Sequence, residues 1–343
     1  MSMAMGLATA RGEGRVHWRE IRPSPGEAVV VLVLAMALAA LGLGDTKLGA
    51  LVAPLIGAGP GSNAGLLLDA MTGLLIAGAV LANLILLRLL PFTVQVGVIW
   101  IELVLLFVAF IGSFDRDFGV WFQVNESGTS NIAFLITTGA VTTLYVSLIS
   151  IIFASFLAMA AALGRLSKNG AAYGAAAFYI SFFRGTPLLL QVYLIYIGLP
   201  QLGPQFALDA VPSGVLALSL CYGAYMAEIF RAGILGVPRG QSEAALALGL
   251  PSGLIFRKIV FPQAMRLIVP PTGNQFIAML KDSALVSVMG VWELTKTAQI
   301  VGKRDFKVFE MLIAAALVYW VMSICLELIQ SRLESYFGKG SER

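Results

Sequence analysis

Polar side chains that could bind a small charged solute lie within long apolar stretches of the sequence. Asn274 and Lys281 are seven residues apart, so a helix would carry both on one face. Arg184 and Gln191 share one neighbouring stretch, and Glu228 lies in another. If these stretches cross a membrane, each charge costs at least about 2.5 kcal/mol and is a candidate for function. Such a set would suit a solute with both a carboxylate and an ammonium group. Charges that pair only with one another would equally hold a helix bundle together.

Other kinds of chemistry are excluded by the residue types. His17 is the only histidine, and Cys221 and Cys325 are the only cysteines, so the chain cannot build a histidine-based triad, a multi-histidine metal site or a disulfide framework. The glycine-rich segment 57–65 lacks the Gly-Lys-Ser/Thr ending of a phosphate-binding loop, which favours a plain outer loop. We therefore expect no catalytic residue, no metal, no cofactor and no nucleic-acid partner.

The segment from Pro238 to Pro262 contains the start and stop signals of a short helix followed by a second helix. It reads PRGQSEAALALGLPSGLIFRKIVFP. Pro238 suits a first helical turn, Gly249 suits a left-handed stop and the next proline prevents continuation, which predicts a helix over 239–248. Ser252 would cap a second helix that ends before Pro262. Two such helices on the cytoplasmic face would form a docking platform, or would lie on lipid headgroups as an ordinary amphipathic loop.

The spacing within this segment resembles the "EAA" loop of permease subunits of ABC-type importers. The residues that carry the resemblance are Glu243-Ala244-Ala245, Gly249, Ile259 and Phe261-Pro262, with Phe261 where the family usually has leucine. Two further runs, FFRGTPLLLQ at 182–191 and AEIFRAGI at 227–234, look like the polar amino-acid permeases of the histidine and glutamine type. The resemblance covers about residues 132–337.

This resemblance implies an all-α integral membrane protein with a five-helix type I ABC importer permease core. Glu243, Ala244, Ala245 and Gly249 would couple the permease to an ATPase subunit, which would hydrolyse the ATP. The implied partners are two copies of that ATPase, an extracytoplasmic amino-acid-binding protein, and a second permease that is identical or similar. The implied function is the translocation of polar amino acids across the inner membrane, with no enzymatic activity in the chain itself.

Two functions from other classes compete with this one. An ion-coupled secondary transporter acting alone would account for buried charges and interrupted helices, but it leaves the 238–262 segment unexplained. A membrane-embedded hydrolase would have to use a Ser/Lys or Asp pair, because the chain lacks a histidine-based site.

The composition places these residues in a polytopic membrane protein. The chain has 343 residues, of which 58% are hydrophobic and only 12% charged, whereas a soluble domain carries about 25% charged residues. Eight apolar stretches are long enough, or nearly so, to cross a bilayer. They are Gly26–Gly44, Leu66–Leu90, Thr93–Ile111, Ile132–Leu163, Ala171–Leu199, Val211–Leu235, Met265–Val288 and Phe309–Ile329.

The distribution of positive charge predicts the orientation and the domain boundaries. With both termini in the cytoplasm, most of the 23 Lys and Arg residues fall inside. The polar connection 111–132 would separate an accessory three-helix segment, 28–131, from a permease core, 132–334, with cytoplasmic tails at 1–27 and 335–343. The first stretch lacks a convincing cleavage site, which favours a retained helix over a signal peptide.

Prolines predict breaks in two of the core spans. Pro187 lacks an amide hydrogen and would clash with the carbonyl of Phe183, so the fifth helix should open near Gly185. Pro270 and Pro271 predict a second break, in the seventh helix. Two interrupted helices in one core are typical of a solute pathway, although packing kinks would leave the same signature.

Overall fold

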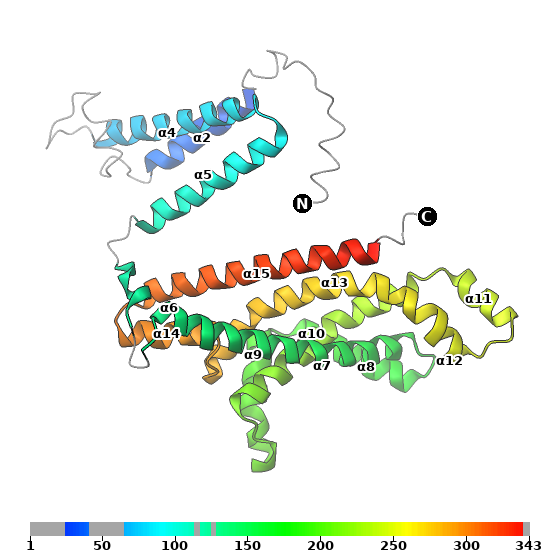
Figure 1. Cartoon of the computed structure of the whole chain (residues 1–343). Helices are drawn as coiled ribbons and strands as arrows, with labels where there is room; N and C mark the ends of the chain where they lie inside the picture. The colour runs from blue at the N-terminus through cyan, green and yellow to red at the C-terminus, as the bar shows by residue number, and fades with distance from the viewer. Residues whose placement is uncertain (1–24, 41–64, 113–116, 125–127, 339–343) are drawn as a thin grey trace. The chain divides into compact units, whose positions relative to one another are not determined.

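The computed structural model describes residues 25–40, 65–112, 117–124 and 128–338 (Figure 1). These residues form helices, with an isolated β-bridge between Val124 and Ser130 and no strand among them. The chain divides into two units, Met1–Asp115 and Arg116–Arg343. Several predicted segments lie partly outside the described residues: residues 1–24 of the predicted tail 1–27, the end of the first predicted span at 41–44, most of the glycine-rich segment, and the last five residues.

The described residues of the first unit form three helices, α2 (Pro25–Ala40), α4 (Gly65–Leu87) and α5 (Phe92–Gly112). α2 packs against α4. A hydrogen bond links α4 to α5, with Asn83 Nδ2 donating to Glu102 Oε2 over 2.8 Å. Most large apolar side chains of α5 are exposed, as at Ile101 and Leu106. An apolar surface on nearly every side is what a helix surrounded by lipid presents.

The second unit carries the candidate site. It begins with η4 (Phe118–Phe122) and one 36-residue helical rod made of α6 (Asn131–Phe134), the π turn η5 (Leu135–Ala140) and α7 (Val141–Leu166). The rest, in order, is α8 (Gly170–Gly185), α9 (Leu188–Tyr193), η6 (Leu194–Gly198), η7 (Leu199–Leu202), η8 (Pro204–Phe206), α10 (Ala210–Leu235), α11 (Arg239–Ala247), α12 (Ser252–Ile255), η9 (Phe256–Val260), α13 (Phe261–Asp282), η10 (Ser283–Met289), α14 (Leu294–Arg304) and α15 (Val308–Gly338).

Membrane-length helices are fewer than the sequence predicts. In the described part of the chain, four helices are long and apolar enough to span a bilayer, and five if the bent pair 170–185 and 188–202 counts as one span. The predicted count of eight is not confirmed. α13 falls short in apolar character because it carries polar side chains such as Arg266, Asn274 and Lys281 along its length.

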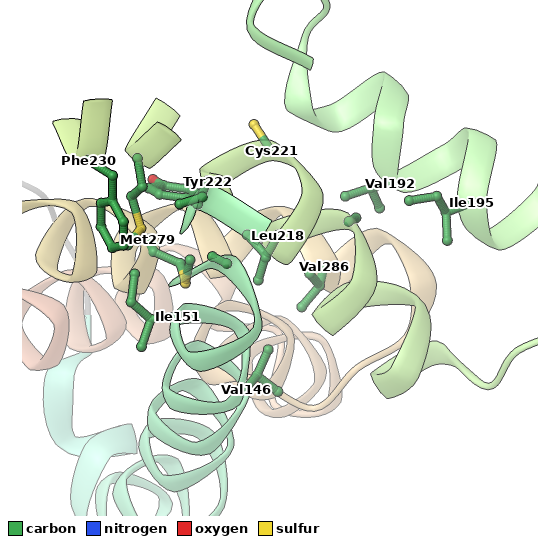
Figure 2. Packing of buried hydrophobic residues seen from close by; sticks show 14 of the residues in the cluster. Val146, Ile151, Val192, Ile195, Leu218, Cys221, Tyr222, Phe230, Met279 and Val286 are labelled. Atoms are coloured by element: carbon green, nitrogen blue, oxygen red, sulfur yellow. The ribbon is translucent and has the colours of Figure 1, made fainter. Parts of the chain in front are cut away.

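The main core of the second unit forms where α10 packs between α7, α13 and η10. Val146, Ile151, Leu218, Met279 and Val286 are buried there, as Figure 2 shows. Small residues line the α7–α10 contact and let the two backbones approach closely, as is common between membrane helices. A second buried cluster joins η4, η5, α14 and α15, at the opposite end of this unit from α11 and α12 (Figure 1).

Candidate functional site

α11 is the short, terminated helix that the sequence predicts. It runs from Arg239 to Ala247. Gly249, the second residue after the helix, has a φ of +77°, which is in the left-handed region. The amide of Gly249 donates to Leu246 O over 2.9 Å, and the amide of Leu250 donates to Ala245 O over 3.2 Å. This pair of bonds is a Schellman motif, in which glycine avoids the steric cost of a Cβ. The predicted left-handed stop is confirmed.

Three of the four predicted coupling residues are exposed, and one is buried. Glu243 and Ala244 are exposed on α11, and Gly249 is exposed in the turn after it. Ala245 is buried, so this side of α11 packs against the rest of the unit. Sequence reasoning missed the apolar side chains beside them, since Leu246 is 62% exposed and Leu248 81%. The alternation in ALALGL was the signal available for these two leucines.

A groove of about 320 Å³ lies between α11 and the helix that follows. Its lining is mostly apolar and comes from Ser242, Glu243, Leu246, Ser252, Ile255, Phe256 and Val260. The outer face of α11 therefore combines one carboxylate with exposed apolar surface. Such a face is suited to insertion into a complementary cleft on a partner protein.

The prediction that a second loop helix is capped by Ser252 and ends before Pro262 is wrong. The N-cap of α12 is Pro251, and no side chain caps the helix. Instead of ending, α12 passes through the π turn η9 into α13, with the amide of Phe261 donating to Phe256 O. Pro262 has no amide to donate, and it lies in the first turn of α13, directly after the π turn. Helical backbone is therefore continuous from Ser252 to Asp282.

The predicted opening of the fifth helix is confirmed. α8 ends at Gly185, α9 begins at Leu188, and the chain bends by 108° between them. In a continuous helix, Phe183 O would accept from residue 187, which is proline and has no amide hydrogen. Gln191 Nε2 takes that place, donating to Phe183 O over 2.9 Å and to Thr186 O over 3.1 Å. Gln191 is buried, so its amide holds the bend.

The predicted break at Pro270 and Pro271 is wrong, because α13 is continuous through both. The two prolines remove donors only from the carbonyls of Arg266 and Leu267. Carbonyls nearby take side-chain donors: Thr272 Oγ1 donates to Ile268 O over 2.8 Å, and Gln330 Nε2 of α15 donates to Pro270 O. Membrane helices tolerate proline where neighbouring side chains and helices support the backbone in this way.

The remaining predicted pathway residues lie on three helices. Arg184, Asn274 and Lys281 are exposed on the surface of the second unit. The guanidinium of Arg184 lies 5.4 Å from the centre of the Tyr225 ring on α10, within the range of a cation–π contact. Glu228 instead forms a 2.8 Å ion pair with Arg231, one turn further along its own helix.

One polar contact that sequence reasoning did not anticipate joins α10 to α13. The hydroxyl of Tyr222 donates to Asp282 Oδ2 over 2.8 Å, next to Lys281. Tyr222 is buried, whereas the carboxylate lies at the surface. The only sequence signal was the spacing of Tyr222 and Tyr225, which places both aromatic rings on one side of a helix. Among the described residues, no group of three or more His, Cys, Asp or Glu side chains could hold a metal ion.

Comparison with known proteins identifies the second unit. A family described as "Binding-protein-dependent transport system inner membrane component" matches residues 150–338, from within α7 to the end of α15. The chain is 39% identical to the probable amino-acid permease protein YxeN of Bacillus subtilis, over 57% of this chain and 88% of that protein. It is 38% identical to the L-cystine transport system permease protein TcyB of Bacillus subtilis, over 60% and 89%.

A solved structure, described as an amino acid ABC transporter with histidines, contains a chain that is 37% identical, with a TM-score of 0.55 over 60% of this chain and 94% of that one. The shared fold is that of a type I ABC permease, and the matched region contains α11 and the bent pair α8–α9. Since the family match covers more than half of the sequence, the chain belongs to the family of inner membrane components of binding-protein-dependent transport systems, the permease subunits of ABC importers.

Proposed function

We propose that this permease carries polar amino acids, and that α11 couples it to the ATPase. The observation that carries the proposal is α11 itself, a short helix closed by left-handed Gly249, with Glu243 and Ala244 on its exposed face. The proposed solute class is supported by the relatives named as permeases for amino acids and for L-cystine. Membership in this family, whose ATPase is a separate subunit, leaves the ion-coupled alternative without support.

The continuity of α12, η9 and α13 supports a mechanical role for this loop. At 1.5 Å per residue, the helical rod from Ser252 to Asp282 is about 45 Å long. It begins at the groove beside α11 and ends at Lys281 and Asp282. Because packed helices move as rigid elements, a displacement that the ATPase imposes on α11 would reach the polar end of α13 directly.

Exposed polar side chains support a pathway along the surface that includes Arg184, Asn274 and Lys281. Contact with lipid would cost each charge at least about 2.5 kcal/mol, so these side chains require water or protein in front of them. A second permease subunit, identical or similar, would enclose this face and create the pathway. Arg184 and Lys281 would then offer partners to the solute carboxylate. Gln191 would act indirectly by holding the bend.

The complete assembly follows from the same proposal. Two ATPase subunits would bind the α11 ends of two permeases, and an extracytoplasmic amino-acid-binding protein would deliver the solute at the other end. Both termini would be cytoplasmic, with eight spans divided between the accessory segment 28–131 and the core 132–334. The tails 1–27 and 335–343 would lie in the cytoplasm.

The test is ATP-driven uptake by the permease, its ATPase and its binding protein in liposomes. We expect labelled arginine, glutamine or cystine to accumulate only with ATP, to compete with one another more strongly than with leucine, and to be unaffected by ionophores. Lys281→Met should lower uptake about tenfold, or about 1.4 kcal/mol, with basal ATP hydrolysis unchanged. Uptake that an ionophore abolishes, or that proceeds without ATP, would refute the proposal.

A matched control is available on α10. Removing Glu228 and Arg231 together, as Glu228→Gln and Arg231→Gln, deletes a pair that is satisfied within its own helix. Since the pair is partly exposed, its loss should change stability by no more than about 1 kcal/mol, and uptake should continue. If the double variant fails while Lys281→Met transports normally, the pathway lies along α10 rather than along the end of α13.

A further inference from the structure

The turn between α14 and α15 presents a single aromatic ring to solvent on a strained backbone. Phe306 has a φ of +54°, and it is the only residue other than glycine with a positive φ among those that the structure describes. Its side chain is 94% exposed. Glycine or asparagine is the usual occupant of this conformation, because a Cβ clashes with the backbone there. A bulky aromatic residue in this position gains nothing for folding.

The turn closes α14 as a Schellman motif, the arrangement also found at Gly249, with the amide of Phe306 donating to Lys303 O over 3.4 Å. The amide of Lys307 donates to Gly302 O over 2.7 Å, and the amide of Asp305 donates to Val301 O over 3.1 Å. Strained residues persist where the surrounding structure over-determines them, and they cluster at functional sites.

A buried side chain ties this turn to the start of the core. Asn131, which is fully buried, donates to Asp305 Oδ2 over 3.1 Å and accepts from Arg304 over 2.9 Å. Arg304 in turn donates to both carboxylate oxygens of Asp305, over 2.7 and 2.8 Å. The guanidinium lowers the pKa of Asp305, which keeps the carboxylate ionised and the network closed. The ring of Phe306 is therefore held on a rigid support.

The surroundings of Phe306 are basic, with a second exposed aromatic residue on the neighbouring element. Lys303 is exposed, and Lys307 lies 3.9 Å from Asp117 at the start of η4. Phe122, at the end of η4, is 72% exposed. Because Arg304 pairs with Asp305 and Lys307 pairs with Asp117, the positive charge left beside the ring is that of the exposed Lys303. An apolar pocket with acidic side chains at its rim would complement this surface.

The position of the turn indicates which partner would bring such a pocket. The turn lies at the opposite end of the second unit from α11 (Figure 1), which is the extracytoplasmic end if α11 meets the ATPase. The family is by description binding-protein-dependent.

We propose that the turn 303–307 is a docking point for the extracytoplasmic binding protein, with Phe306 inserted into an apolar pocket that has an acidic rim. This inference rests on the proposed function. It assigns the recognition of the binding protein to a residue on the permease core and not to the solute pathway. Rigid aromatic anchors of this kind dominate the energetics of many protein interfaces.

The test measures stimulation of ATP hydrolysis by the complete complex in nanodiscs. The probe is the purified binding protein that stimulates the wild-type complex, loaded with amino acid and titrated. Phe306→Asn removes the ring but suits the left-handed backbone. We expect it to raise the half-saturating concentration of binding protein at least tenfold, with basal hydrolysis and melting temperature unchanged. Phe306→Trp keeps a ring and should stay within about threefold of wild type. Phe178→Asn, at an exposed aromatic on α8, is the matched control.

Each result decides the matter. An unchanged half-saturating concentration in Phe306→Asn would overturn the docking role while leaving the proposed function intact. Lower basal hydrolysis or a lower melting temperature in that variant, with normal titration, would assign the ring to lipid or to packing within the complex, and would also overturn it. A wild-type complex that no binding protein stimulates would overturn this inference together with the proposed function.

Discussion

Gln191 replaces a hydrogen-bond donor that Pro187 takes away. Its amide nitrogen donates to the carbonyls of Phe183 and Thr186, and also to Thr186 Oγ1 over 3.0 Å. These acceptors lie at the 108° bend between α8 and α9, which has no amide of its own to offer at residue 187. The amide nitrogen of this predicted pathway residue thus positions the backbone, while its Oε1 is buried without a hydrogen-bond partner among the described residues.

Gln191→Leu tests this role. Leucine has a similar volume but no donor, so the carbonyls of Phe183 and Thr186 would be left unsatisfied, at a cost of about 1–3 kcal/mol. The melting temperature in nanodiscs should fall, and uptake should fall with it. The control is Gln201→Leu, at an exposed position after the bend. A Gln191→Leu protein as stable as wild type would show that the bend does not depend on this amide.

Gly249 is a residue on which we propose that coupling depends. At a φ of +77°, valine would cost about 1–2 kcal/mol and would distort the end of α11. We expect Gly249→Val to insert normally and to hydrolyse ATP, but to lose at least tenfold in uptake. Gly253→Val is the control, because that glycine has helical geometry and open space around it. Equal uptake by the two variants would contradict a coupling role for this turn.

At the scale of elements, the close contact of α7 with α10 sets the shape of the core. Gly223 of α10 allows it, since a Cβ there would come within 2.9 Å of Leu157 Cβ and 3.3 Å of Ala154 O on α7, as well as within 2.5 Å of the Tyr179 hydroxyl on α8. Small residues at such points let membrane helices approach closely, and a hydrogen bond from Ser219 Oγ of α10 to Ser150 O of α7, over 3.2 Å, adds to this contact. The bent pair α8–α9 and helix α13 both pack against α10. The position of the candidate pathway therefore depends on this contact.

Gly223→Val should separate α7 from α10. Overpacking of this kind costs about 1–3 kcal/mol, so a lower melting temperature and reduced assembly with the ATPase are expected. Gly174→Val is the comparison, because Gly174 lies in helix α8 and a Cβ added there would meet no atom within 4 Å. If the two variants melt at the same temperature, the α7–α10 contact can accommodate a larger side chain at position 223, and the prediction is wrong.

At the scale of the whole molecule, the second unit has two ends to which we assign different proposed functions. α11 and its groove lie at one end, and η4 with the turn after α14 lies at the other (Figure 1). The long helices between them, α7, α10, α13 and α15, connect these ends. A permease must respond to ATP on one side of the membrane and to a binding protein on the other, and this arrangement separates the two surfaces.

Labelling from outside the cell tests the orientation of the two ends. Cysteines would be placed at Phe118, in η4, and at Glu243, in α11, within a variant that lacks Cys221 and Cys325. An impermeant maleimide should label position 118 in intact cells and position 243 only after lysis. Labelling of position 243 from outside would overturn the orientation, the coupling role of α11 and the docking role of Phe306 together.

Some features of this protein were determined by the sequence alone, because their causes are local. Proline and glycine act on their own backbone, so the bend at Pro187 and the left-handed end of α11 at Gly249 were predictable. Composition alone identified a membrane protein, and the spacing in the 238–262 segment alone indicated the permease family.

Tertiary structure decided what depends on neighbours distant in the chain. α13 remains straight enough to continue through Pro270 and Pro271 in a setting where α15 supplies Gln330, sixty residues away in sequence. Phe306 carries no local signal at all. The turn on which it lies is hydrogen-bonded to Asn131, at the start of the core, a contact between residues more than 170 positions apart in the chain.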